Sequence, residues 1–169
     1  AFGPVHLEVA TSLSSLGAMY SDQGKFAEAE PLYKRSLAIR ERVLGVEHPQ
    51  LPTDLNNLAR LDENQRKYVE AATLYKRSLV IRESALGPGH PDVANSLTDL
   101  AFLYKKQAIY AEAEPLFKRS LAIREKTLGP DHPDVGNSLN ALAALYYDQG
   151  KYAEAEPLYK RSLGIWEKS

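Results

Sequence analysis

Apolar residues recur along most of the chain at intervals of three and four, the spacing that places them on one face of an α-helix. One such stripe follows the His-Pro pair at residues 90–91 and includes Val93 and Leu97. A second stripe begins at Tyr68 and ends before Gly87, which predicts a helix of about 19 residues. The pattern therefore indicates pairs of amphipathic helices, which we call helix A and helix B of each pair.

The whole pattern repeats every 42 residues. The run KRSLAIRE at 34–41 returns with small changes from residues 76, 118 and 160. The histidines keep the same period, and the chain has no others: His6, His48, His90 and His132. One helix pair cannot bury its apolar stripe alone, whereas stacked pairs share a continuous core. The period therefore predicts a single all-α repeat domain over residues 1–169, with units 4–45, 46–87, 88–129 and 130–169.

Prolines and glycines predict where the helices begin and end. Gly24 and Gly150 suit the left-handed conformation that closes helix A. Pro52 predicts a delayed start for helix A of the second unit. We expect a late or kinked start of helix B in three units, because each carries a proline about five residues in: Pro31, Pro115 and Pro157.

Composition narrows the function. The 169 residues are 44% apolar and 25% charged, as in soluble globular proteins, and the formal net charge is −1. Such a charge provides no overall field for nucleic acid or an anionic membrane, and no run approaches the roughly 20 apolar residues of a membrane helix. The absence of cysteine excludes disulfides and thiolate chemistry and suits a reducing compartment, so we expect a cytoplasmic protein.

No arrangement of residues predicts catalysis. Equivalent helices in a stack lie roughly 8 to 10 Å apart, too far for the four histidines to share a metal that needs ligands within about 2.1 Å. We expect each imidazole to cap the start of helix A instead. Phosphate-binding glycine loops and hydrolase motifs are missing, and the carboxylates on helix B stand beside Lys and Arg. The sequence predicts a chain that is no enzyme and has no metal or cofactor.

Three segments of the repeat resemble a known family. The patterns Leu-x-x-Leu-Ala-x-x-Tyr, Gln-Gly-Lys-Tyr-x-Glu-Ala and Leu-Tyr-x-x-Ser-Leu resemble the tetratricopeptide repeat. The 42-residue period with Leu-Gly-x-x-His-Pro is similar to the kinesin light chain variant of that repeat. The resemblance implies a right-handed superhelical solenoid whose concave groove is lined by the A helices. It also implies a protein-interaction scaffold that binds an extended peptide or partner protein in that groove.

The family's register predicts which side chains face the groove. An asparagine amide can both donate to and accept from a peptide backbone, although asparagine also suits any hydrated helix surface. The same register places Thr98, Ala141 and Ala144 there. The candidate groove residues are Asn56, Asn57, Arg60, Glu63, Asn64, Asn95, Asp99, Phe102, Lys105, Lys106, Asn137, Asn140 and Tyr147.

The identity of the ligand stays open. The carboxylate clamp of tetratricopeptide cochaperones is disfavoured, because units one to three retain only its central residue, Asn57. Tryptophan-acidic peptides, bound by kinesin relatives, would need a more basic wall than this one. The alternative function is a structural or self-associating segment of a larger signalling or enzymatic protein, without a groove ligand. Residues 2–4 align with the end of a repeat, which favours such a fragment.

Two substitutions within the repeat generate further expectations. Asp62 stands where the other units have a tyrosine, which predicts a polar notch in the groove wall between Arg60 and Glu63, or simple sequence drift. Trp166 replaces the arginine of the other units, beside Leu163 on the last helix. We expect this C-terminal face to be apolar and to support end-to-end self-association, unless Trp166 packs within its own unit.

Overall fold

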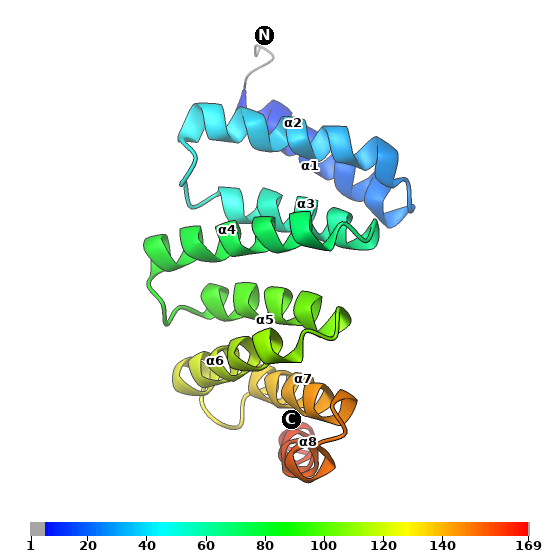
Figure 1. The fold of residues 1–169 in the computed structure, drawn as a ribbon. Coiled ribbons are helices and arrows are strands. Elements are labelled where there is room, and N and C mark those ends of the chain that lie inside the picture. The colour runs from blue at the N-terminus through cyan, green and yellow to red at the C-terminus, as the bar shows by residue number, and fades with distance from the viewer. Residues whose placement is uncertain (1–5, 169) are drawn as a thin grey trace. The chain divides into compact units, whose positions relative to one another are not determined.

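The computed structural model describes residues 6–168, which fold into α-helices with no strand among them. The predicted all-α repeat fold is therefore confirmed, and each repeat is a pair of neighbouring antiparallel helices (Figure 1). The helices are α1 (Leu7–Asp22), α2 (Phe26–Leu44), α3 (Leu51–Asn64), α4 (Tyr68–Leu86), α5 (Pro91–Lys106), α6 (Tyr110–Leu128), α7 (Pro133–Asp148) and α8 (Tyr152–Trp166).

The chain divides into two compact parts of two repeats each; these parts are called the first and the second unit, and a single 42-residue segment is called a repeat. The first ends at Ala85 in the last turn of α4 and contains the first two helix pairs. The second begins at Leu86 and contains the pairs α5–α6 and α7–α8. Within residues 6–168, no helix is long and apolar enough to cross a membrane.

Three of the four histidines cap helix A, as the sequence predicts, whereas Nδ1 of His48 accepts from the amide of Gln50 before α3 begins at Leu51. Nδ1 of His90 accepts a hydrogen bond from the amide of Asp92, and Nδ1 of His132 accepts one from Asp134, both at 3.1 Å. His6 makes the same contact at the start of α1. Each imidazole thereby satisfies one of the backbone donors that a helix start leaves without a partner.

The loops inside each helix pair contain three residues and one left-handed position. Gly24 and Gly150 hold this position, with φ near +73° and +72°, as predicted. The other two pairs place Arg66 and Ala108 there, at φ of 62° and 57°. The left-handed turn is thus a property of the repeat, kept even where no glycine relieves the strain on the side chain.

The expected late start of helix B is wrong. α2, α6 and α8 begin at the same repeat position as α4, although α4 has Thr73 where the others have proline. The proline stands at the sixth position of the helix, where it removes a single backbone hydrogen bond. Packing of the following three turns outweighs that loss. The delayed start predicted for α3 is confirmed, since α3 begins at Leu51, whereas the repeat position at which α5 and α7 begin is Pro49.

A buried serine fastens the two helices of each repeat. The hydroxyl of Ser120 on α6 donates to the carbonyl of Ala94 on α5 at 2.9 Å, and Ser162 donates to Gly136 at 2.8 Å. Small residues on both helices, such as the fully buried Ala113, allow the backbones to approach closely enough for this contact. The same bond recurs once per repeat, at Ser36, Ser78, Ser120 and Ser162.

Neighbouring repeats within a unit share an apolar core. In the first unit, Tyr33 and Leu37 of α2 pack against Leu51, Leu55 and other residues of α3. At the edge of this core, Arg40 of α2 donates to the carboxylate of Asp54 on α3 at 2.8 Å. The Asp54 side chain is 0% exposed, so its charge depends on Arg40 for compensation.

Removing this compensation is expected to destabilise the first unit. Asp54→Ala leaves the Arg40 guanidinium, which is only 15% exposed, without its carboxylate, and we expect a loss of about 3 kcal/mol. Glu156→Gln is the control, because its ion pair with Lys160 is exposed and contributes less than about 0.5 kcal/mol. Urea unfolding followed by circular dichroism measures both. Equal midpoints for the two variants would contradict a structural role for the buried pair.

Candidate functional site

A hollow between α5 and α7 is the candidate site of the second unit. Its volume is about 330 Å³. Side chains from both A helices form its wall and floor, and one arginine from α6 closes its edge. The lining residues are Thr98, Phe102, Arg124, Asp134, Asn137, Ser138, Asn140, Ala141 and Ala144.

The hollow brings together three of the predicted groove residues, Phe102, Asn137 and Asn140. Asn137 and Asn140 are exposed, one turn apart on α7, so their amides are accessible to a ligand. Phe102 is 45% exposed, and its ring packs edge-on against Phe117 at a centroid distance of 5.0 Å. The ring is therefore held in place while nearly half of the side chain stays exposed beside the hollow.

The remaining predicted residues of the second unit lie outside the hollow. Lys105 forms an ion pair with Asp148 at 2.7 Å, which neutralises a cation expected in the groove. The ring of Tyr147 packs against Tyr152 of α8. Asn95 accepts a hydrogen bond from Arg124, so its carbonyl oxygen already has a donor. Two residues that the sequence also placed in the groove do not line the hollow: Asp99 and Lys106.

The predicted residues of the first unit all belong to α3. Arg60 and Asn64 are exposed, whereas Asn56 and Asn57 are half-buried. Glu63 accepts a hydrogen bond from the hydroxyl of Tyr75 on α4 at 3.5 Å. This contact ties Glu63 to its own helix pair.

Arg124 is the main residue of the hollow that sequence reasoning missed. Within the described chain it donates only to neutral oxygens, among them Ser138 Oγ at 2.6 Å and Thr98 Oγ1 at 3.2 Å. Burial lowers the pKa of Arg124 from its ordinary value, and the nearby Asp134 and Asp99 oppose that shift. The equivalent arginine of the first unit, Arg40, has a carboxylate partner instead.

A sequence signal for Arg124 was present. Arginine recurs with the repeat period at 40, 82 and 124, and the position it contacts on the following A helix changes from Asp54 to Ser138. The mixed charge of the surrounding run concealed this signal. Asp134, the acidic residue among those that line the hollow, was also missed, because its function as the capped residue of α7 does not appear in the groove pattern.

A second cluster of charges lies in the first unit, at Asp62. The carboxylate of Glu30 on α2 accepts from Lys34 at 2.6 Å and from Lys67 at 2.9 Å, and Asp62 lies 4.0 Å from Lys67. The hydrogen bonds from Lys34 and Lys67 lower the pKa of Glu30 from 4.5 to about 2. Burial raises the pKa of Asp62, opposed by Lys67.

The notch expected at Asp62 therefore has different neighbours. It opens beside Glu30 and Lys67, and neither Arg60 nor Glu63 lines it. A helix turns by about 100° per residue, so the side chains two positions before and one position after Asp62 point in other directions.

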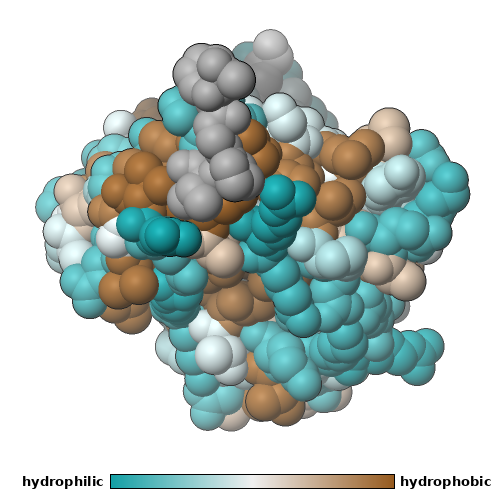
Figure 2. Space-filling view, turned by 90° about the horizontal axis from the view of Figure 1, so that it is seen from above, coloured by the Kyte–Doolittle hydropathy of each residue, from teal (hydrophilic) through white to brown (hydrophobic). Residues whose placement is uncertain are grey.

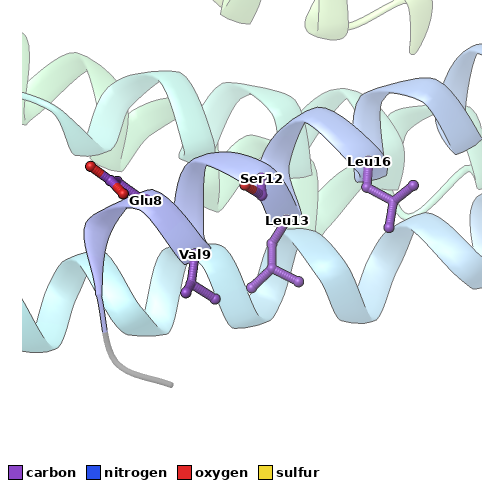
Figure 3. A pocket seen from close by; sticks show the side chains of 5 residues that line it. All are labelled: Glu8, Val9, Ser12, Leu13 and Leu16. Atoms are coloured by element: carbon purple, nitrogen blue, oxygen red, sulfur yellow. The ribbon is translucent and has the colours of Figure 1, made fainter. Parts of the chain in front are cut away.

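The first helix presents an apolar strip. Val9, Leu13 and Leu16 line an open hollow of about 310 Å³ on one side of α1 (Figure 3). The molecule viewed from the α1 and α2 end shows apolar side chains on this face (Figure 2). In α3 the residues at the positions of Val9 and Leu13 are 0% exposed, because α2 covers them.

The last helix presents a second apolar strip. Leu163 is 58% and Trp166 49% exposed on α8. The indole of Trp166 also packs within its own unit, since a Cβ added at Gly136 would lie 3.2 Å from the indole nitrogen. Trp166 therefore packs within its own unit while about half of its surface stays exposed beside Leu163.

Among residues 6–168, no group of three or more His, Cys, Asp or Glu side chains could hold a metal ion. The surfaces that differ from repeat to repeat are the apolar strips on α1 and α8, the hollow between α5 and α7, and the notch beside Asp62.

The 42-residue repeat matches models of a known repeat family. Two family models of the tetratricopeptide repeat match the chain, one over residues 9–50 and the other over 55–126 and 105–168. The chain belongs to the tetratricopeptide repeat family. Members of this family mediate protein–protein interactions and are typically scaffolds without catalytic activity.

Solved tetratricopeptide structures support the kinesin light chain-like type. BtubC (BKLC) from P. vanneervenii is 26% identical with a TM-score of 0.86, over 94% of this chain and 63% of that one. The chain thus spans less than two thirds of BtubC. A putative kinesin light chain of Podosopora anserina with nearly identical TPR-like repeats is 28% identical with a TM-score of 0.86, over 99% of this chain and 80% of that one. No curated protein matches in sequence.

The Glu30 cluster makes stability depend on pH in the acid range. The pKa of Glu30 falls from 4.5 to about 2 on folding, so its contribution is complete above pH 4.5 and is lost as pH decreases toward 2. We expect Glu30→Gln to lose on the order of 1 kcal/mol at neutral pH, after screening by solvent, and to equal the parent chain near pH 2. Urea midpoints measured across this range compare the two chains. Titration of Glu30 near 4.5 in NMR spectra would contradict the assignment.

Proposed function

We propose that this tetratricopeptide chain is a protein-interaction scaffold that binds an extended peptide in the hollow between α5 and α7. The observation that carries the proposal is the pair of exposed amides, Asn137 and Asn140, placed one turn apart beside the Phe102 ring. An amide both donates to and accepts from a peptide backbone, and an aromatic face binds an apolar side chain. The cytoplasm stays the predicted compartment.

Arg124 makes this hollow favour ligands that carry a hydrogen-bond acceptor. Its guanidinium makes hydrogen bonds only to neutral groups of the described chain and faces the hollow, so it can donate to a further acceptor on the ligand. A peptide carbonyl or a polar side chain fits this position. Asp134 and the nearby Asp99 moderate the positive potential and favour ligands of mixed rather than purely acidic composition.

Selection from a phage-displayed random peptide library tests the scaffold function. We expect selected peptides, measured by fluorescence anisotropy, to bind the Asn137→Ala, Asn140→Ala double variant at least about tenfold more weakly, because two hydrogen-bonding amides are lost. Glu156→Gln, which changes an exposed ion pair on α8, is expected to bind as the parent does. Selected peptides that bind both variants equally well would contradict binding in this hollow.

Self-association is a second candidate function. The exposed strip of α8 and the strip of α1 have the repeat positions at which α6 packs on α7 inside the second unit. We propose a head-to-tail contact in which α8 of one copy covers Val9 and Leu13 of another. Because this contact joins two different surfaces, it can continue from copy to copy.

Light scattering across a concentration series measures this association. We expect the average mass to increase with concentration, and Leu163→Glu or Leu13→Glu to restore a monomer by placing a charge in the contact. Glu156→Gln leaves both strips intact and is expected to associate as the parent does. Association that persists in both glutamate variants would rule out these two faces.

A further inference from the structure

In the second unit, one tyrosine side chain lies between two neighbouring repeats. Tyr146 of α7 is 9% exposed, and its hydroxyl donates to Glu114 of α6 at 3.0 Å. Two ammonium groups approach the faces of its ring, Lys118 at 6.0 Å and Lys151 at 5.6 Å from the centroid. The carboxylate and the two cations thus bind a phenol, through one charge-assisted hydrogen bond and two cation–π contacts.

The first unit contains the same three groups without the phenol. Glu30, Lys34 and Lys67 stand two repeat periods before Glu114, Lys118 and Lys151. The residue two periods before Tyr146 is Asp62, whose shorter side chain leaves the place of the ring open. Lys67 has moved to 2.9 Å from Glu30, whereas its equivalent lies 4.0 Å from the corresponding carboxylate.

An open cleft results. Its volume is about 510 Å³, and it lies between α2, α3 and α4. The lining contains the three charged groups, the further carboxylates of Asp62 and Glu70, and apolar side chains such as Val69, which is 77% exposed. The lining residues are Glu30, Lys34, Leu58, Asp62, Lys67, Val69, Glu70, Thr73 and Leu74.

We propose that this cleft binds a tyrosine side chain of a partner protein, with the phenol hydroxyl donating to Glu30 and the ring lying between Lys34 and Lys67. The second unit indicates this occupant, because its equivalent groups bind the phenol of Tyr146. Leu58 and Leu74 contribute apolar contact for the ring. All lining residues belong to the first unit, so the inference does not depend on the peptide hollow of the second.

A phenol fits these charges better than a basic side chain does. Both ammonium groups are bound to the Glu30 carboxylate, and Asp62 is buried 4.0 Å from Lys67. An entering guanidinium would therefore be repelled by the two ammonium groups and would have only the exposed, solvent-screened carboxylate of Glu70 as a partner. A neutral phenol instead gains from both cations through its ring faces. Its hydroxyl also donates to Glu30, as the hydroxyl of Tyr146 donates to Glu114.

NMR titration of the full chain with N-acetyltyrosinamide tests this proposal. We expect saturable shifts of amides within residues 58–74, with a dissociation constant on the order of 1 mM for so small a probe. N-acetylphenylalaninamide, which lacks the hydroxyl, is expected to bind about fivefold more weakly. Asp62→Tyr restores the residue of the other repeats, fills the cleft and is expected to abolish the shifts.

A matched pair of variants separates the cleft from general charge effects. Glu30→Gln removes the carboxylate acceptor and is expected to weaken binding about fivefold. Glu156→Gln changes the same repeat position in the last pair, outside the cleft, and is expected to leave binding unchanged. Equal binding of the tyrosine and phenylalanine probes, preference for N-acetylargininamide, or shifts that persist in Asp62→Tyr would each overturn the proposal.

Discussion

The close approach of the two helices in each repeat is the constraint on which the rest of this structure depends. A buried serine of helix B donates to a main-chain carbonyl of helix A, 26 residues earlier, once in every repeat. The acceptor residues are compact, namely Ala10, Pro52, Ala94 and Gly136, and both alanines are 0% exposed. Together with the small residues around it, the bond restricts how the two helices rotate and slide against each other, and therefore which helix positions face the next repeat.

Positions that the packing does not fix are where the repeats differ in chemistry. Arg40 and Arg124 occupy the same place on helix B, yet Asp54 compensates the first and Ser138 only accepts a hydrogen bond from the second. One substitution thus converts an internal ion pair into a guanidinium that faces a hollow. The scaffold tolerates the change because the serine contact and the leucine core around it are unaffected.

The sequence predicted the helices well and the directions of single side chains less well. Periodicity, the histidine caps and the glycine turns located the helices, because these depend on local geometry that repeats four times. It did not show that α6 and α8 accommodate a proline without a late start, since that depends on tertiary packing. The groove register found Phe102, Asn137 and Asn140, which lie on helix A. It missed Arg124, because that side chain reaches the hollow from helix B across 26 residues of sequence separation from Thr98.

The Asp62 cleft shows how a repeat protein can acquire a binding site by losing a side chain. A tyrosine at this position is an internal ligand, and the carboxylate and ammonium groups that bind it are retained when it is absent. Lys34 lies 2.6 Å from Glu30, as Lys118 lies 2.7 Å from Glu114, so an incoming phenol mainly requires Lys67 to move away from Glu30. The energetic difference from the filled repeat is the burial of Asp62 beside Lys67, while Leu58 and Leu61 of the same helix remain in the apolar core. Any repeat position that binds its own side chain through polar groups can become a recognition site by the same single substitution.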